Sequence, residues 1–224
     1  MMRGSQLDLY LSLGYFRMHQ KLFTCRYLLS YDSILPVHWL RFTLAKVNYG
    51  SKQRSLLRRN EKFSLTVKPF VLTAEAEALF SLYRATVDFE APESVEFWLF
   101  NEAIYPYNVF DTYAIEVRDG EQLIAVGIFD KGDQTIAGIM NFYHPDYRKY
   151  SLGKYLMLQK INYARQQHMQ FYYPGYIVSN YPKFDYKLFP GEAASEVYDD
   201  NSGDWLPFSW ETVHALAAVI LDEP

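Results

Sequence analysis

The chain of 224 residues contains a single cysteine, Cys25. One cysteine excludes an intrachain disulfide and any metal site built from several cysteines, and it favours a reducing compartment. The five histidines are scattered along the chain and show no spacing typical of metal ligands. We therefore expect no bound metal.

Long apolar runs and low-complexity tracts are also missing. The longest apolar run, residues 215–221, is far too short to cross a membrane. Residues 7–13 alternate apolar and polar side chains, but no small-residue cleavage pattern follows them, so we expect no signal peptide. Half of the residues are hydrophobic and 21% are charged. These features predict a folded, cytoplasmic protein.

The net charge of −4 excludes a strongly basic protein that binds nucleic acid indiscriminately. Positive charge is instead concentrated in one stretch, which contains Lys52, Arg54, Arg58, Arg59 and Lys62. Arg54 and Arg58 are four residues apart, so a helix would place them on one face. The stretch fits either a solvated helix end or a phosphate-binding surface.

Alternating apolar residues, caps and turn pairs predict the order of elements from residue 63 onward. Thr73 and Ser94 are good helix caps, and the pairs Asp119-Gly120 and Gly132-Asp133 are typical of hairpin turns. We expect a strand at 63–70, helices after Thr73 and after Ser94 (the second ended by Pro106), strands at 112–118, 122–129 and 134–143, a helix at 151–167, a strand at 170–177, an irregular segment at 178–209, and a terminal helix at 210–221 capped by Ser209.

This order suggests an α/β (α+β) protein with the N-acetyltransferase-like (GNAT) fold, a mixed sheet flanked by helices. We expect a small N-terminal subdomain at 1–60, the GNAT-like domain at 61–208 and a C-terminal helix at 209–224. In this fold the start of the helix near residue 151 meets an anionic or carbonyl ligand, because its first N–H groups are unpaired and its dipole is positive there.

Several ordered motifs carry a more specific signal. They read N-F-Y-H-P-D-Y from residue 141, S-L-G-K-Y from residue 151, P-G-Y-I from residue 174, P-K-F-D-Y-K from residue 182, and Q-R-S-L-L-R-R-N from residue 53. Together they resemble the aminoacyl-tRNA–protein transferases, which include the arginyl-tRNA–protein transferases and the bacterial aspartate/glutamate leucyltransferases. The resemblance covers residues 14–206. The N-terminal cysteine cluster of that family is reduced here to Cys25, and Tyr181 and Phe184 replace a cysteine and a methionine of its last motif.

The resemblance implies an enzyme that transfers an amino acid from aminoacyl-tRNA to the N-terminal α-amine of a protein, typically one with an acidic first residue, in N-terminus-dependent protein degradation. It implies no cofactor beyond the aminoacyl-tRNA donor. Lys187 would neutralise the acidic side chain or the tRNA end, and Asp146 would receive the α-ammonium group. The expected catalytic residues are Tyr143, Asp146, Tyr186 and Lys187; the expected substrate-binding residues are Ser151, Leu152, Gly153 and Tyr176; the expected tRNA-binding residues are Lys52, Arg54, Arg58 and Arg59.

We expect the strands that end at Tyr143 and Tyr176 to splay apart beside the helix that starts at Ser151. The pocket there should be aromatic with few polar groups, and its expected lining is Tyr143, Asp146, Ser151, Leu152, Gly153, Tyr176 and Lys187.

Two alternatives remain from the sequence. The first is an acetyl-CoA-dependent acyltransferase of the same fold, against which stands the lack of a glycine-rich pyrophosphate loop, since Gly153 is the one glycine at the helix start. The second is a catalytically silent module that binds protein N-termini or tRNA. A binding assay paired with a turnover assay separates these possibilities.

Overall fold

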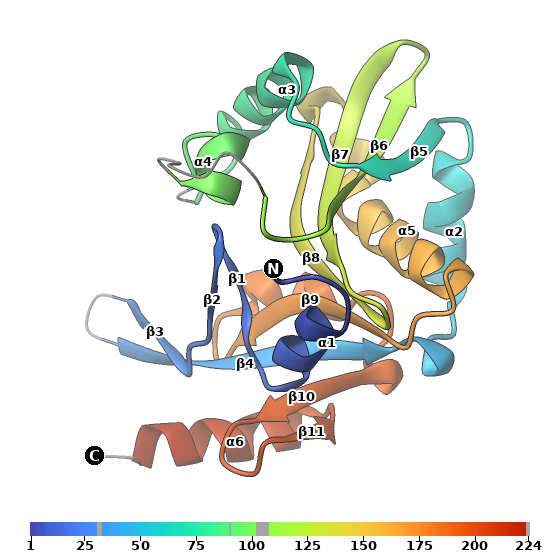
Figure 1. The fold of residues 1–224 in the computed structure, drawn as a ribbon. Helices are drawn as coiled ribbons and strands as arrows, with labels where there is room; N and C mark the ends of the chain where they lie inside the picture. Colours follow the sequence, from blue (N-terminus) through green and yellow to red (C-terminus); the bar gives the residue numbers. More distant parts are fainter. Residues whose placement is uncertain (31–32, 90, 102–107, 223–224) are drawn as a thin grey trace.

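The computed structural model describes residues 1–30, 33–89, 91–101 and 108–222. Its centre is a nine-stranded sheet in the order β11-β10-β4-β9-β8-β7-β6-β5, with β3 paired to β4 (Figure 1). The strands are β3 (Tyr27–Ser30), β4 (Ser33–Thr43), β5 (Ser64–Pro69), β6 (Thr112–Asp119), β7 (Gln122–Lys131), β8 (Thr135–Tyr143), β9 (Phe171–Val178), β10 (Ser195–Asp199) and β11 (Asp204–Pro207). A separate hairpin consists of β1 (Phe16–Met18) and β2 (Lys21–Phe23).

Helices cover both faces of this sheet (Figure 1). They are α1 (Gly4–Ser12), α2 (Ser51–Asn60), α3 (Ala74–Arg84), α4 (Val95–Phe100), α5 (Leu152–Gln166) and α6 (Trp210–Asp222), joined by the 3-10 turns η1 (Leu44–Lys46), η2 (Pro145–Tyr150), η3 (Pro182–Leu188) and η4 (Glu192–Ala194). None of the described helices is long and apolar enough to span a membrane.

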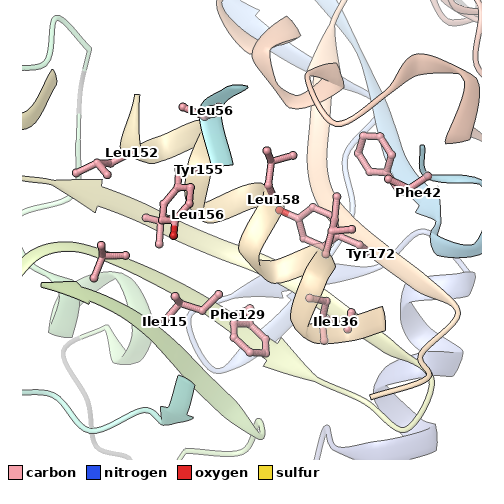
Figure 2. Close-up of a cluster of buried hydrophobic side chains, with 14 of the residues drawn as sticks. Phe42, Leu56, Ile115, Phe129, Ile136, Leu152, Tyr155, Leu156, Leu158 and Tyr172 are labelled. Atoms are coloured by element: carbon pink, nitrogen blue, oxygen red, sulfur yellow. The ribbon is translucent and has the colours of Figure 1, made fainter. Parts of the chain in front are cut away.

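The largest core cluster lies between α5 and the sheet (Figure 2). Leu152, Leu156 and Leu158 of α5 are fully buried against Phe129 and Tyr172 of the sheet. Because the apolar residues of α5 recur at helical spacing, burying them fixes the helix and its first turn on the sheet. A second cluster packs α3 and α4 on β6, β7 and β8.

The predicted elements from residue 63 onward are largely confirmed. Thr73 Oγ1 accepts a hydrogen bond from Ala76 N at 3.1 Å, and Ser94 Oγ accepts one from Phe97 N at 2.9 Å. Ser209 Oγ likewise accepts from Thr212 N at 3.0 Å. Pro106, the expected end of the second helix, lies outside the described residues.

The prediction that residues 178–209 are irregular is wrong. This segment contains β10 and β11, and β10 pairs with β4 through Val197 and Leu40. The pairing partner lies more than 150 residues earlier in the chain, so no local pattern indicates it. Residues 1–60 therefore supply a central strand of the main sheet as well as the separate β1-β2 hairpin, while the division at residue 60 stays a prediction.

The expected splay between the two central strands is confirmed. The pair β8-β9 is parallel and joins only Thr135–Ala137 with Phe171–Tyr173. Immediately beyond, β8 has a bulge, because Ile128 of β7 faces Met140 while Phe129 faces Gly138, which leaves Ile139 as an extra residue. Bulges bend a strand, so the bulge separates the carboxyl end of β8 from β9.

Candidate functional site

A cavity of about 450 Å³ opens where the start of α5 meets α2. Its lining residues are Ser51, Lys52, Ser55, Leu56 and Arg59 of α2, Ser151 and Lys154 at the start of α5, and Phe189 after η3. This volume lies in the range of small-ligand sites.

The first turn of α5 borders this cavity. Ser151 has a left-handed backbone (φ 51°), and its side chain makes no capping hydrogen bond. The first intrahelical hydrogen bond is donated by Tyr155 N to Ser151 O, at 3.0 Å. The preceding N–H groups have no partner within the helix and carry its positive dipole end.

Three contacts hold α2 against this turn. Asn60 Nδ2 donates to Tyr150 O at 3.2 Å, and Arg59 Nη1 donates to Lys149 O at 3.3 Å. At the other end of α2, Gln53 Nε2 donates to Phe189 O at 2.6 Å. These bonds to the backbone place the face of α2 that carries Lys52, Ser55 and Arg59 beside Ser151.

The cavity is strongly basic. Lys52, Arg59 and Lys154 line it, and no acidic side chain does so within the described part of the chain. The Lys154 ammonium lies 4.9 Å from the centre of the Phe189 ring, which holds the charge at the cavity wall. Three cations beside free helix N–H groups form an arrangement suited to phosphate oxygens.

The predicted tRNA-binding residues separate into two groups. Lys52 and Arg59 line the cavity, whereas Arg54 and Arg58 do not. The Arg54 guanidinium instead donates to Tyr49 O. The helix face that Arg54 and Arg58 share is therefore not the face of α2 turned to this cavity, and their role in tRNA binding stays a prediction.

A group of tyrosines lies at the carboxyl end of β8. Tyr143 covers Gly153, where an added Cβ would lie 3.6 Å from Tyr143 Cε1. The Tyr143 ring also packs edge-on against Tyr83 of α3, with ring centres 5.2 Å apart. Burial raises the pKa of Tyr83 to about 12, with smaller contributions from Tyr143 and Tyr186. The sequence motifs do not include Tyr83, which belongs to a different element, α3.

Lys187 of η3 lies against β9. Its Nζ donates to Tyr176 O at 2.7 Å and is surrounded by the rings of Tyr176, Phe184 and Tyr186 at 4.4–5.6 Å. Gly175 has φ 99°, a backbone conformation that favours glycine, and a Cβ there would make only an ordinary contact with Lys187 Cε, at 3.6 Å. Burial lowers the pKa of Lys187 to about 7.

The expected lining of seven residues overlaps this cavity at one position and otherwise stays a prediction. Of that set only Ser151 lines the cavity at α5, which is basic rather than aromatic. Leu152 is a core residue that can offer only its backbone N–H. The Asp146 side chain is 84% exposed in η2, and its role stays a prediction. Tyr186 is 46% exposed, yet burial of its hydroxyl raises its pKa.

The cavity also contains residues that were not among the expected site residues. Ser51, Ser55, Lys154 and Phe189 all line it. Lys154 stands inside the S-L-G-K-Y motif, so its position next to Ser151 was the available signal. Within the described residues, no group of three or more histidine, cysteine or acidic side chains could hold a metal ion.

Comparison with known proteins assigns the chain to a family. Residues 75–190 match the family model described as "Arginine-tRNA-protein transferase, C terminus". The chain belongs to this transferase family. The resemblance read from the sequence motifs is thereby confirmed, and the matched segment contains α5, η2 and η3 but not α2.

Two curated members of the transferase family illustrate the similarity. The aspartate/glutamate leucyltransferase of Nitrosococcus oceani is 30% identical over 154 residues, which are 66% of this chain and 62% of that protein. The enzyme of the same name from Pseudomonas syringae pv. tomato is 29% identical over 140 residues, covering 61% of this chain and 58% of the relative. The chain thus spans about three-fifths of the length of these relatives.

A solved structure confirms the fold class. The crystal structure of FemX superposes with a TM-score of 0.51 at 11% identity, covering 85% of this chain and 65% of that one. The transferase-family chain therefore has the predicted GNAT-like fold, a mixed sheet flanked by helices.

Proposed function

We propose that this protein is an aminoacyltransferase that moves an amino acid from aminoacyl-tRNA to the N-terminal α-amine of a protein with an acidic first residue. The observation that carries the proposal is the basic cavity at the start of α5, in a chain of the arginine-tRNA-protein transferase family. The names of its relatives, aspartate/glutamate leucyltransferases, support the acceptor class.

The donor tRNA occupies the α2 side of the site in this proposal. Phosphates next to the aminoacylated end bind Lys52, Arg59 and Lys154. The charge of the chain as a whole is negative, so this local concentration of cations must supply the attraction for tRNA. The ester is then presented at the splay between β8 and β9.

The acceptor occupies the η3 side of the splay. Lys187, held among aromatic rings at Tyr176 O, supplies a positive charge for the acidic side chain of the first residue. Tyr143 and Tyr186 supply hydroxyl groups near the reacting atoms. No cofactor is required, because the donor ester is already activated.

The reaction needs placement more than a strong nucleophile. The neutral α-amine attacks the ester carbonyl carbon, so the new C–N bond forms and the bond to the ribose oxygen breaks. The amine loses one proton and the ribose oxygen gains one, which balances the step. N–H groups at the start of α5 can stabilise the developing oxyanion, and holding amine and ester together supplies much of the rate. We expect this chemistry in the cytoplasm, where charged tRNA is available.

A transfer assay tests the function. Purified protein is mixed with tRNA charged with labelled leucine or arginine and with peptides that begin with Asp, Glu, Arg or Lys. We expect label to appear on the α-amine of the Asp and Glu peptides, with N-acetylated peptides as the blocked control. Binding of charged tRNA without any transfer would overturn the proposal in favour of a silent module. Transfer from acetyl-CoA but not from tRNA would overturn it in favour of an acetyltransferase.

A further inference from the structure

Asn141 lies on β8 just beyond the point where this strand leaves β9. The pairing of β8 with β9 ends at Ala137, and in the described part of the chain no other strand takes the place of β9 beside the rest of β8 (Figure 1). On its other side Asn141 pairs with Gly127 of β7. The residue therefore has a strand on one side and the splay on the other.

The side chain of Asn141 faces α5. A Cβ added to its partner Gly127 would lie 3.0 Å from Asn141 Oδ1 and 3.1 Å from Leu156 Cδ2 of α5. Tyr143, two residues further along β8, points to the same face because side chains alternate along a strand. The ring of Tyr143 covers Gly153 in the first turn of α5. Asn141 is thus the residue on this face next to the tyrosine at the start of the helix.

Lys160 fixes the direction in which the Asn141 amide points. Lys160 Nζ lies 2.9 Å from Asn141 Oδ1 and also donates to Ile128 O at 2.8 Å and to Met140 O at 3.2 Å. These three acceptors match the three N–H bonds of an ammonium group, which has no acceptor of its own. The Asn141 atom that faces Lys160 must therefore be the carbonyl oxygen, and the amide nitrogen points away from it.

The Asn141 Nδ2 atom is available to a ligand. It makes no hydrogen bond to any described residue, and it does not belong to the unpartnered side-chain atoms that are sealed from solvent. The oxygen and nitrogen of an amide diverge from the same carbon, so with Oδ1 against β7 and Lys160 the nitrogen is directed to the side that β9 has left. The splay therefore contains a fixed, uncharged group that donates hydrogen bonds and accepts none.

A group of this kind selects the atom that it binds. An ammonium or another N–H group offers it no acceptor, so the protonated α-amine of the acceptor protein does not bind there. The carbonyl oxygen of the donor ester is an acceptor, and it gains negative charge as the amine attacks. A donor already held in place stabilises this charge more than it stabilises the neutral ester, which lowers the barrier to transfer.

We propose that Asn141 is a catalytic residue whose Nδ2 donates a hydrogen bond to the carbonyl oxygen of the donor ester. This assignment rests on the proposed function. As the neutral amine forms the new C–N bond, the π electrons of the carbonyl group move to the oxygen that Nδ2 holds. They return when the bond to the ribose oxygen breaks, and the proton lost by the amine passes to the ribose oxygen. Asn141 itself neither gains nor loses a proton.

The kinetics of Asn141→Asp test this role. The variant keeps the shape of the side chain and an oxygen for Lys160, but a second oxygen replaces the N–H donor. We expect kcat for transfer from charged tRNA to an Asp-starting peptide to fall at least about 100-fold, with both KM values within about threefold of the parent. The assay is run at pH 6, below the pKa of about 7 to which burial lowers Lys160, so that its ammonium is present.

Asn162→Asp is the matched control, and circular dichroism shows that both variants are folded. This control makes the same exchange on α5, where the Asn162 side chain is bonded to Tyr49 and Gln159, and it should leave kcat unchanged. A kcat of Asn141→Asp within about threefold of the parent value, or a loss confined to KM, would overturn the role of Asn141 while leaving the transferase function in place. A parent protein that transfers no amino acid would overturn both.

A binding measurement separates the charged oxygen from ordinary contact. Two analogues of aminoacyl-adenosine are compared, one with an amide in place of the ester and one with a tetrahedral phosphonate that carries a charged oxygen. Asn141→Ala removes the donor without adding charge, so it should weaken binding of the phosphonate at least about tenfold more than binding of the amide. Equal losses for the two analogues would overturn the proposal.

Discussion

Three lysines near the splay have very different surroundings. Lys154 lines the basic cavity, Lys187 is half-buried among aromatic rings, and Lys160 is fully buried. Burial lowers the pKa of both Lys160 and Lys187 to about 7. One residue type therefore has three environments here: a cavity wall, a ring of aromatic side chains and the hydrophobic core. The role of each lysine follows from its environment.

The charge of Lys187 should determine how strongly acidic acceptors are preferred. Below a pH of about 7 the ammonium is present, and above it the amine is increasingly neutral. The ratio of kcat/KM for an Asp-starting peptide to that for an Ala-starting peptide should therefore fall as pH rises through about 7. The α-amine titrates equally in both peptides, and the Asp side chain stays ionised, so neither affects the ratio.

Two variants check this prediction. Lys187→Met should lower the ratio about tenfold at pH 6 and make it independent of pH. Lys183→Met removes a charge from the same turn, where Lys183 pairs with the exposed Asp88 at 3.1 Å, and should behave like the parent. A ratio that does not change with pH, or an equal loss in both variants, would assign Lys187 to the tRNA side or to structure.

At the residue scale the sequence predicts part of the site. The family motifs identify Ser151, Lys187 and Tyr143, and the basic stretch identifies Lys52 and Arg59. The motifs do not reveal which face of α2 meets the cavity, because that depends on the bonds from Asn60 to Tyr150 and from Gln53 to Phe189. Tyr83 comes from a different element and is brought in only by packing on Tyr143.

At the element scale the decisive feature is the bulge of β8. Lys160 reaches it from α5 and donates to Ile128 O at 2.8 Å, Met140 O at 3.2 Å and Asn141 Oδ1 at 2.9 Å. The first two carbonyls belong to the residues that pair next to the extra Ile139. Lys160 thus connects α5 to the bulge of β8, which bends the carboxyl end of β8 away from β9.

Replacing Lys160 should destabilise the fold. In Lys160→Met the three acceptors lose their donor inside the core, which should lower the free energy of unfolding by about 3 kcal/mol or more. The exposed Lys149 of η2 provides the matched control, since Lys149→Met should change it by less than about 0.5 kcal/mol. Urea denaturation followed by circular dichroism measures both. A loss of under about 1 kcal/mol in Lys160→Met would show that the bulge does not depend on this side chain.

Local signals account for the elements that the sequence predicts. Caps at Thr73, Ser94 and Ser209 and turn pairs at residues 119–120 and 132–133 fix elements whose partners are near in the chain. The central position of β4 and its pairing with β10 have no such signal, because that pairing joins residues 40 and 197.

At the scale of the whole molecule, the site combines two parts of the chain. The matched family segment, residues 75–190, supplies Ser151, Lys154 and Lys187. Lys52 and Arg59 come from α2, before that segment, and are held in place by bonds to residues 149, 150 and 189. The proposed transfer site therefore requires α2 to pack against the start of α5 and the end of η3.

The most direct test of this account is the salt dependence of charged-tRNA binding by Arg59→Ala and Arg58→Ala. The two variants lose the same charge from adjacent positions of α2, but only Arg59 lines the cavity. We predict that Arg59→Ala reduces the slope of log affinity against log salt concentration by about 0.7 to 0.9, as for one lost phosphate contact, while Arg58→Ala keeps the parent slope. Equal slopes in the two variants, or binding that does not respond to salt, would contradict the assignment of the cavity to tRNA.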